Sequence, residues 1–171
     1  GRGYANDTRD SDGVVRVMPL MIAVGGAPAP ALALEILRVA AGEKQYSVRS
    51  DRSGVLGVQI GNSFIETDRD ARLRLYFSPA YAERRISAAA LLKGEVKPEA
   101  LAHQVAIIGA TAVGVADVAA TPAAPRMDGV EIQAQLLENI LEGSRLRRPP
   151  STRWWELFTL CALAGPMIGY L

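Results

Sequence analysis

The sequence holds very few of the residues that form disulfides or bind transition metals. It has one cysteine, Cys161, and one histidine, His103, among 171 residues. One cysteine excludes an internal disulfide and a thiolate zinc site, and one histidine excludes the two-histidine zinc motifs. The phosphate-binding patterns Gly-x-Gly-x-x-Gly and Gly-x4-Gly-Lys-Ser/Thr are also missing. We therefore expect no catalytic residue, no metal site and no cofactor in this chain.

The chain also lacks an excess of charge of one sign. Its 19 basic and 18 acidic residues leave a formal net charge of +1 at pH 7. A surface that binds nucleic acid needs a marked basic excess, so we expect no nucleic-acid partner. A length of 171 residues fits one ordinary domain with a short appendage, and such a domain buries a stable core without disulfides.

The two ends of the sequence differ from its middle. Residues 1–10 are mostly polar and include neither an initiator methionine nor the apolar region of a signal peptide. We therefore expect the chain to be the later part of a longer protein. At the other end, residues 154–171 carry Glu156 as their one charge. A helix over this segment would be about 27 Å long, close to one hydrocarbon thickness.

Two tryptophans begin this apolar segment and follow an arginine-rich stretch, as in the aromatic belt of a membrane interface. We predict a folded domain over 1–148, a linker over 149–153 and the first part of a transmembrane helix over 154–171. The alternative is a buried C-terminal helix of a soluble domain, but no polar face repeats along this segment.

Between these ends, apolar periodicity predicts strands that alternate with helices. We expect strands over 14–24, 55–60, 72–77 and 105–108, and helices over 28–41, 78–93 and 130–142. Pro19 marks an edge or a bulge in the first strand, and the continuous apolar run 105–108 is typical of a strand buried on both faces. The apolar stripe of the last helix consists of Val130, Ala134, Leu137 and Leu141. The fold class is therefore α/β or α+β, a mixed sheet with packed helices.

The segment after the expected strand 105–108 is the best candidate for a ligand site. Ligands bind at the carboxyl ends of strands in open α/β sheets, and small residues there expose backbone N–H groups. We expect a site lined by Thr111, Asp117 and Thr121, with Arg16 and Glu131 as neighbours. The N-terminus of the following helix would favour an anionic group. The alternative is a structural turn in which the hydroxyls cap the backbone and Asp117 fixes the loop, and spacing alone favours it.

A set of motifs follows in a fixed order along the chain. The set consists of Asp10–Leu20, Leu32–Gly42, Ile86–Gly94, Val105–Asp117, Thr121-Pro122, Gly129–Ala134 and Leu136–Leu141. Together they resemble the type-2 CHASE domain, an extracellular sensor associated with cyclases and histidine kinases in bacterial receptors, over about 10–148. The sequence departs from that family at Val17, Ala71 and Gln133, where the family often has Arg, Gly and His.

This resemblance implies a sensory rather than an enzymatic chain. Such domains are periplasmic or extracellular, sit in the bacterial inner membrane through transmembrane helices, and control a cytoplasmic output domain. We expect an adenylate or guanylate cyclase as that output, with a histidine kinase as another option, a small-molecule or environmental stimulus, and a homodimer. The alternatives are an α/β enzyme that acts on a small molecule with the loop Thr111–Asp117, and a structural dimerisation module of a membrane protein.

Overall fold

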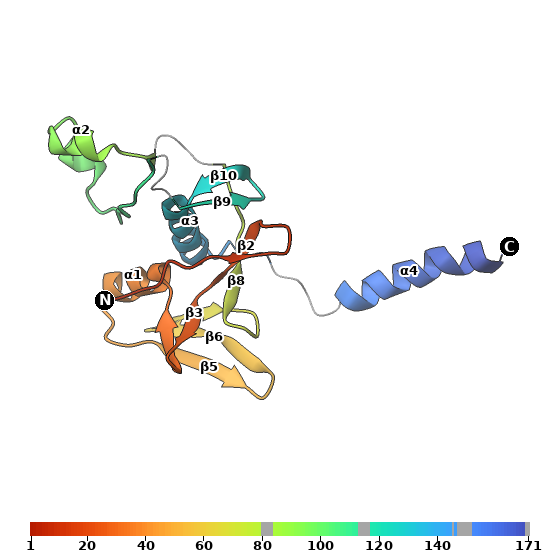
Figure 1. Cartoon of the computed structure of the whole chain (residues 1–171). Coiled ribbons are helices and arrows are strands. Elements are labelled where there is room, and N and C mark those ends of the chain that lie inside the picture. The colour runs from red at the N-terminus through yellow and green to blue at the C-terminus, as the bar shows by residue number, and fades with distance from the viewer. Residues whose placement is uncertain (80–83, 113–116, 145, 147–151, 170–171) are drawn as a thin grey trace.

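Short strands and helices alternate along the chain (Figure 1). The computed structural model describes residues 1–79, 84–112, 117–144, 146 and 152–169, with the backbone alone for 152–154 and 164–169. The strands are β1 (Thr8–Arg9), β2 (Val15–Pro19), β3 (Met21–Val24), β4 (Ala27–Pro30), β5 (Ser47–Asp51), β6 (Gly54–Ile60), β7 (Ser63–Glu66), β8 (Arg72–Arg74), β9 (Val118–Thr121) and β10 (Ala124–Asp128). The helices are α1 (Leu32–Ala40), α2 (Ala88–Leu92), the 3-10 helix η2 (Pro98–Ala100), α3 (Gly129–Glu142) and α4 (Thr152–Gly169).

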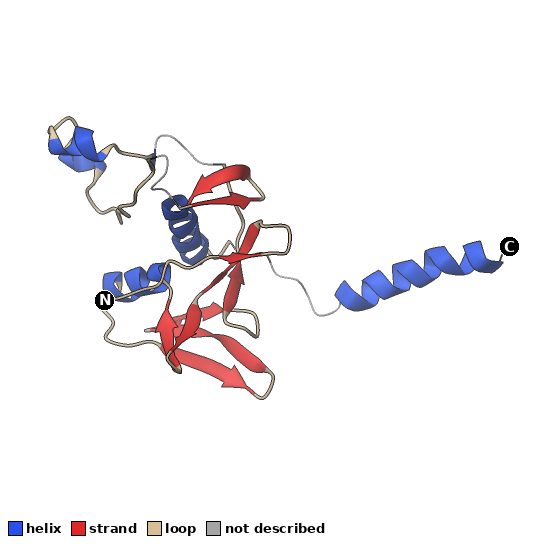
Figure 2. Ribbon diagram, viewed as in Figure 1, coloured by secondary structure: helices blue, strands red, loops and turns tan. Residues whose placement is uncertain are grey.

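The strands pair into several small antiparallel sheets (Figure 2). Two sheets have three strands, in the orders β1-β2-β8 and β5-β6-β7, and two are the hairpins β3-β4 and β9-β10. The prediction of a mixed fold with strands and packed helices is confirmed. Because strands adjacent in sequence make most of these pairs, the class is α+β.

The apolar run 14–24 forms two strands because it contains Pro19. β2 ends at Pro19, which lies opposite Arg72, and β3 begins at Met21. β1 pairs with β2 only at Val15 and Val17. On the β1 side of β2, Pro19 therefore lies at a strand edge, where its lack of an N–H breaks no described hydrogen bond. Between the two strands, the Leu20 N–H donates to the Ala71 carbonyl over 2.8 Å. The predicted edge or bulge at Pro19 is thus the end of one strand.

Helix α1 begins four residues after its predicted start at Pro28. Residues 27–30 form β4 instead, in which Pro28 lies opposite Ala23 and Pro30 opposite Met21. The residue before a proline disfavours the helical conformation, so two prolines in alternate positions hold this stretch extended. The predicted stop is correct, because Gly42 follows the helix at a φ of +70°.

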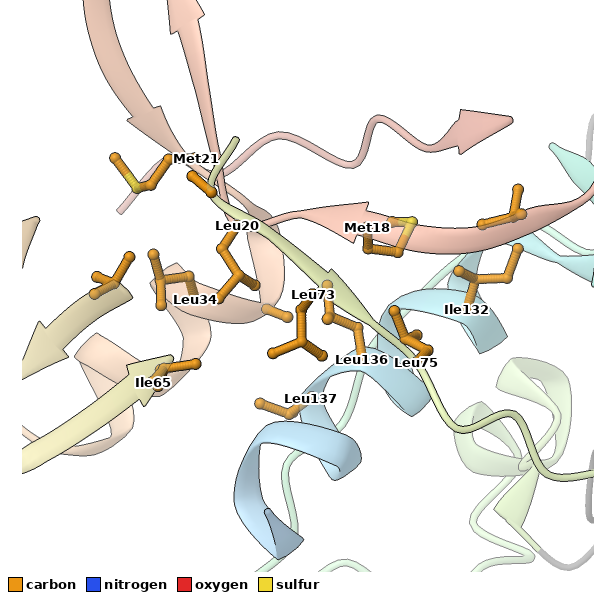
Figure 3. Packing of buried hydrophobic residues seen from close by; sticks show 14 of the residues in the cluster. Met18, Leu20, Met21, Leu34, Ile65, Leu73, Leu75, Ile132, Leu136 and Leu137 are labelled. Atoms are coloured by element: carbon orange, nitrogen blue, oxygen red, sulfur yellow. The ribbon is translucent and has the colours of Figure 1, made fainter. Parts of the chain in front are cut away.

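The hydrophobic core lies where β2, β8, α1 and α3 meet. Leu20, Leu34 and Leu136 are completely buried. The predicted alternation of 72–77 is confirmed, since Leu73 and Leu75 are buried while Tyr76 is exposed. Figure 3 shows Leu73 and Leu75 on the α3 side of their strand, close to Leu136. Burying such a side chain stabilises the fold by about 1.5–3 kcal/mol, so this cluster supplies most of the driving force that joins the elements.

Residues 84–112, which we call the arm, differ most from the prediction. Figure 1 shows α2 standing away from the body of the molecule. Of the helix predicted over 78–93, the described residues show only α2, and residues 80–83 lie outside them. None of the residues of α2 is buried. The strand predicted over 105–108 is wrong for this structure: among the described residues, the segment has no regular secondary structure and no backbone hydrogen bond, and Ile108 is 93% exposed. Apolar side chains favour a strand, but a strand forms only where another strand supplies hydrogen bonds.

Helix α4 occupies the C-terminal segment, apart from the body in Figure 2. A helix was predicted here, but as the first part of a transmembrane span over 154–171. Among the described residues, no helix combines the length and apolarity needed to cross a membrane. The expected span is therefore corrected to a helix of 18 residues, in which Arg153, Glu156 and several small residues lower the mean hydropathy.

Candidate functional site

Arg16, on β2, is held by two carboxylates of the preceding turn. Its Nη1 lies 2.7 Å from Asp10 Oδ2, and its Nη2 lies 2.8 Å from Asp12 Oδ2. The turn forms because Asp12 Oδ1 accepts the Val14 N–H over 3.1 Å, an arrangement typical of Asp before glycine. The hydrogen bonds from Arg16 and then from the Val14 N–H lower the pKa of Asp12 to about 2. This guanidinium is thus already paired within its own hairpin.

Asp117 immediately precedes β9 and joins two parts of the structure. Its carboxylate is 71% exposed, and its Oδ1 lies 3.7 Å from Arg9 Nη2 on β1. Its backbone carbonyl accepts the N–H of Gly129, the first residue of α3, over 2.7 Å. Asp117 therefore connects the β1–β2 hairpin, which carries Arg16, with the start of α3.

The two threonines of the predicted site lie in different surroundings. Thr121 is buried at the end of β9, where its Oγ1 donates to the Ala124 carbonyl and accepts the Ala124 N–H, each over 3.2 Å. This hydroxyl closes the β9–β10 turn, as the structural alternative requires. Thr111 is exposed near the end of the arm. The loop residues 113–116 between Thr111 and Asp117 lie outside the described residues.

Glu131, in the first turn of α3, faces the arm. Its side chain is 11% exposed, and its Oε2 lies 3.5 Å from Arg85 Nε. Arg85 Nη1 also lies 3.1 Å from Asp128 Oδ2. The positive end of the α3 dipole is thus compensated by the protein's own carboxylates, Asp128 and Glu131, where the sequence favoured an external anion. The structure therefore connects Asp117 with the Arg16 hairpin and places Glu131 with Arg85.

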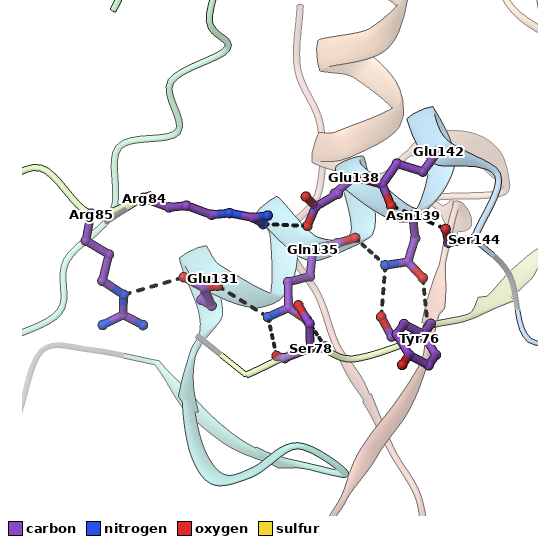
Figure 4. Close-up of polar contacts among 10 residues, drawn as sticks. All are labelled: Tyr76, Ser78, Arg84, Arg85, Glu131, Gln135, Glu138, Asn139, Glu142 and Ser144. Carbon is purple, nitrogen blue, oxygen red and sulfur yellow. Dashed lines mark hydrogen bonds and ion pairs between the residues drawn. The ribbon is translucent and has the colours of Figure 1, made fainter. Parts of the chain in front are cut away.

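Two amides of α3, which the sequence analysis did not select, make the main polar contacts of the buried interface (Figure 4). Asn139 Oδ1 accepts the Tyr76 N–H over 2.7 Å, and its Nδ2 donates to the Tyr76 carbonyl over 3.1 Å. Gln135 does the same at Ser78, with distances of 3.1 and 2.9 Å. The available signal was the spacing: the two amides are four residues apart and so lie on one helix face.

The arginine pair at the start of the arm lies against the acidic side of α3. Arg84 Nη1 lies 2.7 Å from Glu138 Oε2, in addition to the contacts of Arg85 with Asp128 and Glu131 (Figure 4). These carboxylates are more buried than the arginines that cover them. α3 therefore contacts the core on one side and the arm on another.

An apolar hollow of about 180 Å³ lies at the other end of α3. Its walls come from α1, β6, β7 and the last turns of α3, and its lining residues include Leu37, Ile60, Phe64 and Ile140. Among the described residues, no group of three or more His, Cys, Asp or Glu side chains could hold a metal ion.

Comparison with known proteins places these observations in a family. The family model described as CHASE2 domain matches residues 1–169, a longer stretch than the motifs of 10–148. No curated protein and no solved structure matches the chain significantly. The ordered motifs, the α+β fold and the match over nearly the whole length agree: the chain belongs to the CHASE2 family, the extracellular sensory domains of membrane receptors.

Proposed function

We propose that this domain senses a small molecule or another environmental stimulus outside the bacterial inner membrane and controls a cytoplasmic nucleotide cyclase. Membership of a family of extracellular sensory domains supports the sensing role. The chain itself is a sensor and not an enzyme. The cyclase output follows from the association of this family with cyclases, and class III cyclases need two catalytic halves, so we propose that the receptor works as a homodimer.

The observation that carries the relay is the position of α3. Its first residue, Gly129, is hydrogen-bonded to the Asp117 carbonyl over 2.7 Å, and its last turn ends at Gly143. The amides of Gln135 and Asn139 fix the helix between these points. We propose that a displacement at Asp117 passes to the start of this helix through that hydrogen bond. Helix shifts of 1–2 Å are a common form of signal in such switches.

We propose that the stimulus binds beside Asp117 and Thr111, which expose a carboxylate and a hydroxyl to the solvent. Thr121, Arg16 and Glu131 belong to this proposal as supporting residues: Thr121 closes the β9–β10 turn, Arg16 pairs within its own hairpin, and Glu131 pairs with Arg85. Asp117→Asn tests the assignment in the full receptor. We expect a changed response with an unchanged melting temperature, whereas a normal response in a destabilised receptor would leave Asp117 with a structural role only.

The relay is tested by insertions of one to four alanines directly after Ser144 in the full-length receptor. Gly143 ends α3, so these insertions lengthen the connection after the helix, and the formation of cyclic AMP or cyclic GMP in membranes should fall as the insertion grows. The same insertions in the exposed turn at Asn62 are the control, because that turn joins β6 to β7 and leaves the connection after α3 unchanged. A cyclase activity that does not change with insertions after Ser144 would contradict the relay.

A further inference from the structure

The apolar hollow at the end of α3 is built by three parts of the chain that lie far apart in the sequence. They are the end of α1, the β6–β7 hairpin and the last turns of α3, which together supply Leu37, Ala41, Ile60, Ser63, Phe64, Ile65, Ile140 and Leu141. Ile60 and Ile65 are buried, whereas Phe64 and Leu141 are exposed. The hollow therefore has a buried apolar floor and an open apolar rim.

The rim contains the one member of the predicted apolar stripe of α3 that is exposed. Leu141 is 65% exposed, although Leu137, one turn earlier on the same stripe, is buried. Phe64, across the hollow on β7, is also an exposed large apolar side chain. Covering such surface is favourable in proportion to its area. A molecule seated on the floor would be buried itself and would also cover these two side chains.

The size of the hollow limits what can occupy it. Its volume is about 180 Å³. An apolar cavity of about 150 Å³ with walls of Leu, Ile and Phe stays dry and binds benzene. A helix, with a diameter of about 10–12 Å, is too wide for such a space. The occupant that fits is thus a small molecule of one or two rings rather than a segment of polypeptide.

The polarity of the walls limits the charge of the occupant. Seven of the eight lining side chains are apolar, and the eighth, Ser63, has a hydroxyl that can accept a hydrogen bond. A charged molecule would lose its hydration here without gaining a charged partner from the lining. In addition, α1 and α3 both end at this hollow, and the negative ends of helix dipoles disfavour an anion. The walls therefore suit a neutral aromatic molecule with one N–H or O–H donor.

We propose that this hollow binds a small neutral aromatic molecule, of the size of indole or a phenol, between α1, the β6–β7 hairpin and the end of α3. The bound molecule contacts Ile140 and Leu141 and so joins the last turn of α3 to the hairpin. Asp117 is hydrogen-bonded to the first residue of α3, at the other end of the helix. The inference goes beyond the proposed function, since it adds a second ligand site that uses no residue of the Asp117 site.

The test follows the δ1-methyl groups of the isoleucines by NMR in the chain of residues 1–171, while indole is added. We expect the signals of Ile60, Ile65 and Ile140 to shift and to saturate with a Kd of about 0.1–1 mM, which is typical of a ligand of this size. Ile86 and Ile108 are exposed on the arm and should not shift. Unshifted lining residues, or equal shifts on the arm, would overturn the proposal. So would lining signals that shift with protein concentration alone, because a second copy would then occupy the hollow.

A matched pair of variants places the bound indole. Ala41→Phe puts a ring into the hollow, whereas Ala40→Phe puts the same ring on the neighbouring residue, which is also exposed but does not line the hollow. We expect Ala41→Phe to weaken the binding of indole by about tenfold or more and Ala40→Phe to leave it unchanged. Equal affinities of the two variants would overturn the proposal. Because these measurements use neither cyclase activity nor Asp117, failure here is distinct from failure of the proposed function.

Discussion

Asn139 holds Tyr76 as a neighbouring β-strand would. Its side-chain oxygen accepts the Tyr76 N–H over 2.7 Å, and its side-chain nitrogen donates to the Tyr76 carbonyl over 3.1 Å. The same nitrogen donates to the Gln135 carbonyl over 2.8 Å, which fixes the rotamer from within α3. The chain beyond β8 thus has its peptide groups satisfied by a helix, at a point where the sheet β1-β2-β8 has ended.

Replacing Asn139 should therefore destabilise the domain strongly. Asn139→Ala leaves the Tyr76 peptide group unpaired in an interface where Asn139 is 4% exposed, so we expect the free energy of unfolding to fall by about 2–4 kcal/mol. Urea denaturation followed by circular dichroism measures this. Leu141→Ala, two residues along the same helix but 65% exposed, is the control and should change stability by less than about 0.5 kcal/mol. Equal effects of the two variants would contradict the role of the amide.

Gln133 is the opposite case, a buried amide whose oxygen is unsatisfied. It is 3% exposed, and its Oε1 has no hydrogen-bond partner among the described residues. Gln133→Met keeps the length of the side chain and removes the unsatisfied oxygen, so we expect stability to stay equal or to rise by about 1 kcal/mol. The same denaturation assay applies. A loss of more than about 1 kcal/mol would indicate that this oxygen is hydrogen-bonded in solution.

Glu35 should make the domain sensitive to acid. Its carboxylate lies 2.6 Å from Arg38 Nη2, and the hydrogen bonds from Arg38 lower the pKa of Glu35 below its ordinary value of 4.5. Because the folded-state pKa is the lower one, the pair stabilises the fold fully above pH 4.5 and less as the pH falls through that lower value. Glu35→Gln should thus lower the melting temperature at pH 7 and much less at pH 2–3. The exposed Glu99→Gln is the control; a pH-independent difference for Glu35→Gln would contradict the pairing.

The ion pairs of Arg85 should fasten the arm to α3. Arg85→Glu places a negative charge beside Asp128 and Glu131, so we expect faster tryptic cleavage at Lys93 and Lys97 of the released arm. The global free energy of unfolding should change by no more than about 1 kcal/mol, because Arg85 is half exposed. Glu131→Arg in the same chain should restore part of the protection. Cleavage that is unchanged by the reversal would show that the arginine does not hold the arm.

The close approach of Gly109 to α3 offers a second test of the attachment of the arm to α3, one that does not depend on Arg85. A Cβ at this position would meet Val130 Cβ at 2.5 Å, so Gly109→Ala should push the segment 105–112 off the helix. We expect hydrogen exchange near Val130 to increase and the melting temperature to fall by a few degrees, in line with about 1–3 kcal/mol for an overpacked contact. Val130→Gly should relieve the clash, because it removes the Cβ that the new methyl group meets. A double variant that is no better than Gly109→Ala would place the strain elsewhere.

Local patterns allowed much of the fold to be predicted. The alternation of Arg72 to Phe77 predicts its buried face correctly because side chains of an extended chain alternate regardless of context. α3 begins within one residue of its predicted start and ends where predicted, because Gly143 adopts a φ of +68° as a helix stop. Its buried face is less well predicted: Leu141, in the expected apolar stripe, is exposed, while Gln135 and Asn139 are buried.

The candidate site was less predictable, because its contacts join residues far apart in sequence. Asn139 is buried because its amide binds the backbone of Tyr76, 63 residues away. The periodicity of α3 carries no information about this partner. The segment 105–108 shows the converse. The strand predicted from its apolar run is wrong for this structure, because the described residues supply no strand beside it. Among the five predicted ligand residues, Thr121 and Arg16 have partners within their own hairpins, and what Thr111 and Asp117 bind stays a prediction.

The small size of the sheets has a consequence for how the chain folds. β3-β4, β5-β6-β7 and β9-β10 each join neighbouring segments, so each can form in about 1–10 μs without waiting for the others. The pairing of β2 with β8 brings together Pro19 and Arg72, which are far apart in the sequence. Helix α3, which comes later still, then has to dock against both strands. These distant contacts set the rate. Substitutions at Leu73 or Leu136 should therefore slow folding, whereas substitutions in the β6–β7 turn should mainly speed unfolding.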